Sequence, residues 1–268
     1  MKRILLPLTL GLLLTLTACN SPVDAGRDDP GTPSPSTTVS VAPTVSVSPS
    51  PAPAEAPVWE SSGGSCSFTD EDGTILVQGN FSLPRIQNAD GVDAYAAINS
   101  WYEQLLSDLK SDTMANAAQA QDDYATSKAL GDPFAGYSDE EIYEITHEDG
   151  RSVSILRTHF GYTSGPYPTL LYMADHFDLT TGVPLKFADF FPASDKAETF
   201  VRGEVARQAA GHDDYDQGAV ATAFNREYFY LTEEGFVFYY QPQTLNPQAA
   251  TKPEFLVTYD QLEEYLDR

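Results

Sequence analysis

The chain has 268 residues, 41% of them hydrophobic, and carries 39 Asp and Glu residues against 15 Lys and Arg, a formal net charge of −24. Such a surface excludes nucleic acid as a partner, because it has no basic stripe to displace phosphate counterions. The charge either steers a basic partner toward the protein or serves only to keep an extracellular domain soluble.

The N-terminus has the pattern of an export signal. Lys2 and Arg3 precede an apolar run over 4–16, which is too short to span a bilayer as a mature helix but has the length of a signal h-region. The run ends in Leu-Thr-Ala-Cys, which resembles the bacterial lipobox. We therefore predict a lipoprotein signal peptide over 1–18 and a diacylglyceryl group on Cys19 that binds the lipid bilayer at the extracytoplasmic face of the cell membrane. An ordinary secretory signal followed by a chance cysteine is the alternative.

Residues 19–58 have the composition of a disordered stalk. Nine of the 19 prolines lie in 20–57, among Ser, Thr, Ala and Val and without an aromatic residue. Such a segment buries too little apolar surface to fold and favours extended polyproline II. Lipid occupies Cys19, so Cys66 remains alone, and a disulfide framework is excluded.

Aromatic residues begin at Trp59, and the rest of the chain predicts a folded unit. The first half is predicted to hold two strands within 67–84 around a turn at 71–73, and a helix from Asp90 to about residue 112 with Asp93 as its capping-box partner. The next 20 residues prolong the helix, and Gly131 ends it. Strands over 142–147 and 152–160 are predicted to turn at Asp149-Gly150. Further strands are predicted over 170–179, 228–231, 236–240 and 255–257, and helices over 194–210 and 259–267.

Hairpins without regular alternation of strands and helices indicate an α+β fold, with antiparallel sheets and helices packed on one face. The order of elements suggests two small linked subdomains, an N-terminal one over 59–163 and a C-terminal one over 164–268.

Several segments carry a family resemblance. The chain resembles the RsiV-like family, in an N-terminal part over 81–86 and 98–99 and in a C-terminal part over 161–168, 177–182, 187–191, 231–238, 246–250 and 253–259. The resemblance implies paired domains outside the membrane, as in the lysozyme-binding part of an anti-sigma factor and before the catalytic module of a peptidoglycan deacetylase. Only three residues precede the h-region and none follows residue 268, so we expect neither a cytoplasmic anti-sigma segment nor a deacetylase module. Where the family has a histidine-containing turn, this chain reads Ser164 to Pro168, and any role of that histidine is lost.

No catalytic or metal motif stands out. Gly161 to Gly165 has its serine in the wrong place for a nucleophile elbow, and a proline follows it. The four histidines are scattered singly, although His147 and His159 are candidates to face each other across the predicted hairpin. The acidic run 212–216 is interpreted as a solvated loop, with a calcium site as the alternative. We predict no cofactor and no metal.

Tyrosines supply the candidate binding residues, because tyrosine buries area while keeping a polar tip at an interface. The candidate ligand-binding residues are Tyr162, Thr163, Ser164, Gly165 and Tyr167; Tyr172, Tyr239 and Tyr240 lie in nearby predicted strands. The opposing interpretation is that this turn only joins two subdomains and that the tyrosines pack in the core.

Two functions follow as hypotheses. The first is a non-catalytic binding or sensing domain of the cell envelope, with a basic protein such as lysozyme or a cell-wall glycan as its ligand. The second is a peptidoglycan hydrolase that works through acidic residues, because 39 carboxylates guarantee that some lie close together.

Overall fold

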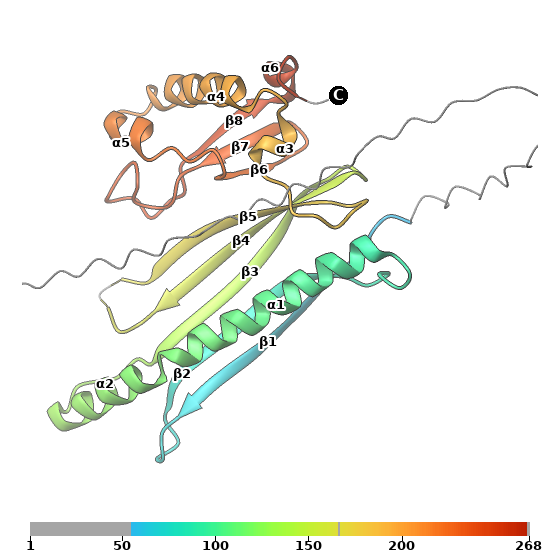
Figure 1. The fold of residues 1–268 in the computed structure, drawn as a ribbon. Helices are drawn as coiled ribbons and strands as arrows, with labels where there is room; N and C mark the ends of the chain where they lie inside the picture. The colour runs from blue at the N-terminus through green and yellow to red at the C-terminus, as the bar shows by residue number, and fades with distance from the viewer. Residues whose placement is uncertain (1–54, 166, 267–268) are drawn as a thin grey trace, which may run out of the picture. The chain divides into compact units, whose positions relative to one another are not determined.

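Residues 55–165 and 167–266 are described by a computed structural model and fold around two β-sheets (Figure 1). The first sheet has the order β1-β2-β3-β4-β5 and the second the order β6-β7-β8. The predicted signal peptide, Cys19 and the stalk up to residue 54 lie outside the described residues. Within those residues, no helix combines the length and the apolar composition that crossing a bilayer requires.

The first hairpin pairs β1 (Trp59–Thr69) with β2 (Ile75–Ile86) in antiparallel register. Its turn lies at the predicted position, where Gly73 adopts a φ of 87° that a residue with a Cβ rarely takes. β1 begins well before the predicted strand. Its first half is rich in Ser and Gly and has low β-propensity, so the sequence predicts no strand there, but the ladder to β2 holds it extended.

Two helices, α1 (Asp93–Ala115) and α2 (Ala117–Leu130), connect β2 to β3 (Tyr137–Glu148). They return the chain to the end of the sheet where β2 began, so β2 and β3 pair in parallel. The expectation of purely antiparallel sheets is therefore wrong at this pair. The predicted capping box at Asp90 is wrong too, since Val92 is the N-cap and no side chain caps it.

Strands β3, β4 (Ser152–Tyr162) and β5 (Thr169–Asp178) form an antiparallel meander that turns at the predicted Asp149-Gly150. The register places His159 opposite Glu141 and His147 opposite Ser154, so the two histidines do not face each other as predicted. The subdomain boundary predicted between residues 163 and 164 falls between β4 and β5, which are hydrogen-bonded neighbours in one sheet.

The second sheet and its helices follow β5. Its elements are α3 (Phe187–Phe190), α4 (Ser194–Ala209), α5 (Gln217–Thr222), β6 (Phe229–Leu231), β7 (Gly235–Tyr239), β8 (Glu254–Thr258) and α6 (Tyr259–Leu262). The predicted capping box of Thr258 with Gln261 is confirmed, although α6 is shorter than predicted. The acidic run 212–216 ends in Asp216, whose side chain caps α5, a helix missing from the sequence prediction.

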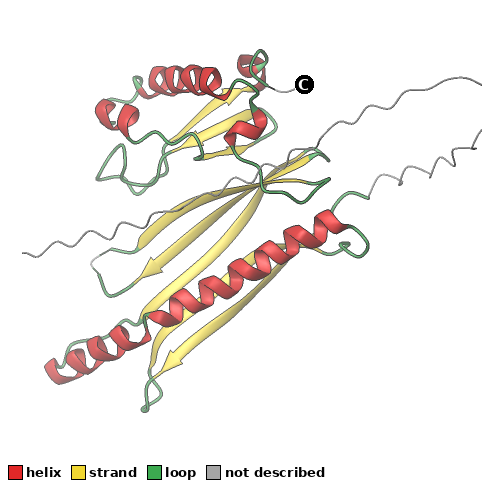
Figure 2. Cartoon of the chain, viewed as in Figure 1, coloured by secondary structure: helices red, strands yellow, loops and turns green. Residues whose placement is uncertain are grey.

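Three clusters of buried apolar residues hold the described elements together. The α+β class is confirmed (Figure 2). Val153, Ile155 and Phe177 of the first sheet pack in one core with the apolar stripe of α1. The alternate residues Ser154 and His176 point to the opposite face, where they bond to the backbone of β6. β4 and β5 are thus covered on both faces where they meet β6.

Candidate functional site

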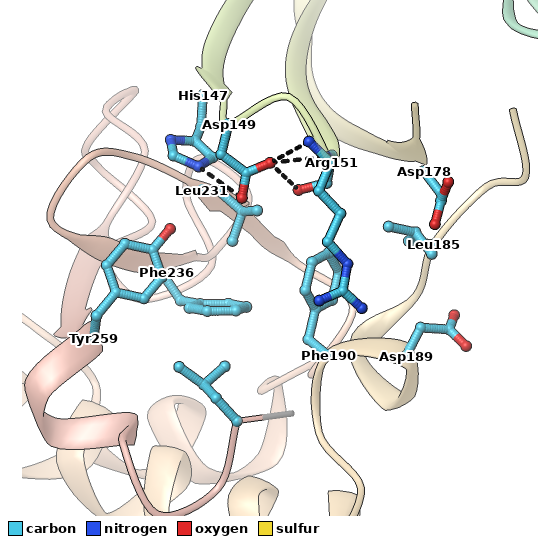
Figure 3. A pocket seen from close by; sticks show the side chains of 12 residues that line it. His147, Asp149, Arg151, Asp178, Leu185, Asp189, Phe190, Leu231, Phe236 and Tyr259 are labelled. Atoms are coloured by element: carbon cyan, nitrogen blue, oxygen red, sulfur yellow. Dashed lines mark hydrogen bonds and ion pairs between the residues drawn. The ribbon is translucent and has the colours of Figure 1, made fainter. Parts of the chain in front are cut away.

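A cavity of about 210 Å³ lies where the β3–β4 turn meets the elements that follow β5 (Figure 3). Its walls come from three parts of the chain that are distant in sequence. They are His147, Asp149, Arg151, Ser152, Asp178, Leu185, Asp189, Phe190, Leu231, Phe236, Tyr259 and Leu266.

The β3–β4 turn positions the first of three carboxylates. Gly150 takes the left-handed φ of 77° that the turn needs, and Asp149 Oδ1 accepts hydrogen bonds from the backbone N–H groups of Arg151 (3.0 Å) and Ser152 (2.7 Å). Burial works to raise the pKa of Asp149, but the two backbone hydrogen bonds outweigh it and lower that pKa. Asp149 is therefore held as a carboxylate.

Two further carboxylates are held in the same manner. Asp178 Oδ1 accepts from the N–H groups of Thr180 and Thr181 at 2.7 and 2.9 Å, and Asp189 Oδ2 accepts from the N–H of Lys186 at 2.8 Å. In each of these aspartates, one oxygen is bound to a turn of the backbone. The other oxygen makes no hydrogen bond within the described part of the chain.

Arg151 extends between these groups in Figure 3 and forms no ion pair with any residue of 55–165 and 167–266. Every other arginine of the described residues forms at least one. The paired arginines are Arg85, Arg157, Arg202, Arg207 and Arg226. Arg151 thus lines the cavity without bonding to the carboxylates of the described chain that line the same space.

His147 contributes a buried polar atom. Its side chain is only 9% exposed, and Nε2 lies 3.9 Å from Asp149 Oδ2. Nδ1 lies 3.4 Å from an oxygen of the exposed Glu233 but makes no hydrogen bond. Nδ1 is thus buried against Glu233, in a contact without hydrogen-bond alignment, and exposes no surface to the cavity.

Apolar side chains form the rest of the wall. Phe190, Leu231 and Phe236 are buried or half-buried and belong to or pack against the core beneath the second sheet. His176 lies close by, where its ring stacks on Phe229 at 4.4 Å and meets Phe190 edge-on at 5.8 Å. Burial lowers the pKa of His176 to about 4, so it is neutral at physiological pH.

A second polar cluster lies under α1. Arg157 donates to Glu141 and, through Nε and Nη2, to both oxygens of Asp175 at 2.6 and 3.2 Å. Glu141 also contacts His159 Nδ1 at 3.1 Å, which raises the pKa of His159. Tyr102 of α1 donates to Asp175 at 3.1 Å. These groups satisfy one another beneath the helix, so we assign the cluster to structure.

Tyrosines surround a second cavity of about 310 Å³ beside β5. Its polar groups are already bound, because the Gln241 amide pairs with both the N–H and the C=O of Tyr172. The Tyr239 hydroxyl also donates to that carbonyl at 3.3 Å. Tyr240 lies in the core, where its hydroxyl donates to the Val220 carbonyl at 2.6 Å. Tyr172 and Tyr239 thus join the two sheets.

The predicted ligand-binding residues lie in the β4–β5 loop and not at the 210 Å³ cavity. Tyr162 ends β4, Ser164 takes a φ of 62°, and Tyr167 is 80% exposed. β4 begins at the cavity and ends at this loop. At ~3.3 Å per strand residue, the cavity and the loop lie roughly 30 Å apart. Sequence reasoning found the Asp149-Gly150 turn but missed Arg151 and His147, because nothing local shows which turn another layer will cover.

Within the part of the chain that the structure describes, no group of three or more His, Cys, Asp or Glu side chains is arranged to hold a metal ion. Cys66 is a partly buried residue of β1 whose Sγ lies 3.9 Å from the Lys110 carbonyl.

Comparisons with known proteins identify the C-terminal part. Residues 188–260 match the model of the family described as "Protein of unknown function (DUF3298)", so a DUF3298 domain is present there. No curated protein sequence matches the chain. The RsiV-like resemblance stays a prediction.

Two crystal structures share the fold. A DUF3298 family member from Bacteroides fragilis NCTC 9343 has a TM-score of 0.60 at 15% identity, over 80% of this chain and 94% of that one. A DUF3298 family protein from Pseudomonas aeruginosa PAO1 has a TM-score of 0.55 at 16% identity, over 80% of this chain and 95% of that one. At such identities the likeness concerns the fold alone.

Proposed function

We propose that this protein is a non-catalytic binding domain of the cell envelope, anchored through a diacylglyceryl group on Cys19, and that its ligand is a basic protein such as lysozyme. A cell-wall glycan is the second candidate ligand. The observation that carries the proposal is an acidic and apolar surface at the end of the first sheet, next to the loop that contains Tyr167.

Exposed apolar side chains gather at this end of the sheet. In residues 55–165 and 167–266, eight large apolar side chains are exposed. Four of them lie in β3, β4, the β4–β5 loop and β5: Ile142 (43%), Phe160 (38%), Tyr167 (80%) and Leu171 (40%). Ile142 and Phe160 share the face opposite α1, because strand residues alternate and Phe160 pairs with Glu140. Gathered apolar exposure of this kind is typical of an interaction surface.

The charges beside this patch are negative. The exposed Glu140 and Glu144 flank Ile142 on β3, and the whole strand contains five acidic residues and no Lys or Arg. We name Glu140, Ile142, Glu144, Phe160 and Tyr167 the acidic-apolar surface. Its composition suits a partner with basic residues around an apolar contact, and the net charge of −24 steers such a partner.

Titration of the whole chain with a basic lysozyme at low and moderate salt tests the partner. We expect binding that weakens as salt screens the charges. Phe160→Ser combined with Tyr167→Ala should weaken binding at least tenfold. Leu130→Ser is the matched control, since Leu130 is 71% exposed on α2 and outside the surface. No binding at low salt would refute the protein partner and leave the glycan, which a pull-down with insoluble peptidoglycan examines.

The anchor and the lack of catalysis have their own tests. Mass spectrometry of the mature N-terminus should find Cys19 diacylated, and cleavage elsewhere would contradict the anchor. Incubation with peptidoglycan should release no fragments. Release that one carboxylate substitution abolishes would instead support the hydrolase.

A further inference from the structure

We propose that the outer edge of β1 is a binding site for an extended peptide segment of another protein, which adds a strand to the first sheet. The expected segment is uncharged in its middle and carries Lys or Arg at both ends. β1 is an edge strand of that sheet (Figure 1). It lies apart from the strands that form the acidic-apolar surface, and the inference does not depend on the function proposed for that surface.

Alternate residues of β1 direct their backbone groups away from β2. The Val58 carbonyl accepts from the Gln87 N–H at 2.8 Å, which places Val58 on the bonded side of the antiparallel ladder. Bonding alternates along such a ladder, and the register is continuous up to Phe68, so the even-numbered residues bond to β2. The odd-numbered residues each turn one N–H and one C=O outward. Between Trp59 and Phe68 they are Ser61, Gly63, Ser65 and Ser67.

These outward groups, which we name the β1 edge, have no hydrogen-bond partner within residues 55–165 and 167–266. The side chains of 61–67 are four Ser, two Gly and one Cys, too small to cover the edge. Lys110 of α1 takes the place of a side chain at Gly64, where a Cβ would lie 2.4 Å from its Nζ. Gly64 faces α1, as Cys66 does, so this ammonium lies over the face of the sheet and leaves the edge open.

The other three edges of the two sheets are bonded by side chains. On β5, the Gln241 amide bonds to both the N–H and the C=O of Tyr172. Ser154 and His176 bond to outward groups of β6, and Gln208 of α4 donates to a carbonyl of β8 at 2.7 Å. Proteins commonly cover or charge their sheet edges, because free backbone groups pair with other chains. β1 departs from this pattern, and it contains no Lys, Arg or Pro.

The charges around the β1 edge favour a basic segment of another protein. Residues 61–69 carry no charge, whereas the exposed Glu60 precedes them and the exposed Glu71 follows them in the turn. Lys or Arg at both ends of an added strand would lie beside these carboxylates. A second copy of β1 in antiparallel order would bring Glu60 near the acidic turn of the other copy, and each chain carries −24. Such like charges oppose self-pairing.

Strand addition fits these observations chemically. In this mode of recognition, hydrogen bonds between main chains supply the affinity and alternate side chains supply the specificity. The outward groups between Ser61 and Ser67 match an extended segment of about seven residues. Small side chains on both faces of β1 impose little steric selection, so we expect charge at the two ends to decide which segments bind.

Amide hydrogen exchange followed by NMR of the whole chain tests whether the edge is open. We expect the odd-numbered N–H groups from Ser61 to Ser67 to exchange at least tenfold faster than the even-numbered ones between them, which β2 holds. Protection of the odd-numbered groups in dilute solution would mean that residues 1–54 cover the edge. Protection that rises with protein concentration would mean self-pairing. Either result would overturn the proposal.

Three peptides of nine residues with blocked termini test the ligand. The first is Lys-Lys-Thr-Val-Thr-Val-Thr-Lys-Lys. The second is the same peptide with methyl groups on two adjacent central amide nitrogens, which blocks both of its edges, and the third has Glu in place of each Lys. By calorimetry, we expect the first to bind below millimolar concentration and the other two at least tenfold more weakly. Binding should slow the exchange of the odd-numbered N–H groups of the β1 edge.

Variants connect peptide binding to the β1 edge. Ser65→Pro removes an outward N–H and places a ring where the added strand would pair, while the ladder to β2 keeps its bonds, so the chain should fold. It should weaken binding of the first peptide at least tenfold, and Ser65→Ala, which keeps the N–H, should not. Glu60→Gln combined with Glu71→Gln leaves the backbone unchanged and should reduce the preference for the Lys peptide over the Glu peptide at least threefold.

Three further results would overturn the site: no binding of the first peptide at millimolar concentration, equal binding of the methylated peptide, or equal binding by folded Ser65→Pro. If Ser65→Pro does not fold, the methylated peptide and the exchange pattern decide. The outcome is distinguishable from that of the lysozyme titration. Phe160→Ser combined with Tyr167→Ala should leave peptide binding intact, and Ser65→Pro should leave lysozyme binding intact.

Discussion

Arg151 and Arg157 lie six residues apart along the chain. They differ in whether the charged groups around them are paired. Arg157 is 8% exposed on its side chain, and its guanidinium pairs with Glu141 and Asp175 between α1 and the first sheet. Arg151 is exposed at the edge of a cavity, beside aspartates with which it forms no ion pair. The first cluster is closed, and the second leaves donors and acceptors unused.

The difference separates a structural cluster from a candidate binding site. Burial and shifted pKa values alone would favour the Arg157 cluster, because such groups are concentrated at functional sites. Its groups, however, satisfy one another beneath a helix. At the cavity, backbone turns hold one oxygen of each aspartate and leave the other open. Unused hydrogen-bonding capacity is the better indicator of a candidate site here.

The largest expected effect comes from breaking the closed cluster. Arg157→Ala leaves Glu141 with His159 alone and Asp175 with the Tyr102 hydroxyl alone, and removal of one partner of a buried ion pair typically costs about 3–5 kcal/mol. Urea denaturation measures the free energy of unfolding. Replacing Arg157, Glu141 and Asp175 together with apolar residues of similar size should recover most of the loss. A change below about 1 kcal/mol for Arg157→Ala would mean that water solvates these groups.

The buried His176 and the half-buried His159 should respond to pH in opposite directions. The pKa of His176 is lowered from 6.5 to about 4, so the unfolded state binds a proton more readily, and stability is lost as pH falls from 6.5 toward 4, by about 3 kcal/mol in all. The pKa of His159 is raised, so its stabilisation is present below pH 6.5 and is lost as pH rises through the raised value.

Chemical denaturation between pH 4 and 8 measures both effects. His176→Phe should remove the acid-side loss, because phenylalanine does not titrate and can stack on Phe229 as the imidazole does. His159→Gln should remove only the loss at higher pH. Equal acid sensitivity in His176→Phe and the parent chain would show that the His176 pKa is not lowered.

A smaller loss of stability is expected at Asp149, where two substitutions separate the hydrogen bonds of the side chain from its charge. Asp149→Ala removes the acceptor for the N–H groups of Arg151 and Ser152 and should cost about 1 kcal/mol. Asp149→Asn keeps an oxygen for these bonds and should cost less than about 0.5 kcal/mol. Thermal unfolding of both variants compares them. Equal losses would mean that the charge, and not the turn, stabilises this region.

The smallest effect on stability is expected at Arg151. Arg151→Gln removes no ion pair and should change the free energy of unfolding by less than about 0.5 kcal/mol, whereas Arg157→Gln should cost several times more. The same denaturation experiment compares the two arginines directly. A large loss at Arg151 would show that it supports the turn and would weaken the contrast between the two regions.

Local patterns predicted most of the elements correctly. The turns at Gly73 and Gly150 lie where the sequence predicts them, because only glycine readily adopts their left-handed φ. The apolar stripe of α1 and the capping box of Thr258 likewise depend on spacings of three and four residues. In contrast, the parallel pair of β2 and β3 depends on the path of two helices and has no local signature.

The sequence by itself determined the acidic charge, the α+β class, the turns and the exposed Tyr167 loop, because each depends on composition or on neighbours a few residues apart. Only the tertiary structure decided which arginine is paired and which lines a cavity. Arg151 and Arg157 have the same chemistry. Arg157 pairs with Glu141 and Asp175 from neighbouring strands, whereas Arg151 shares a cavity with Asp178 and Asp189 and forms no ion pair with them. The register of β3, β4 and β5 places Arg157 beneath α1, and the packing of the second sheet against the β3–β4 turn forms the cavity at Arg151.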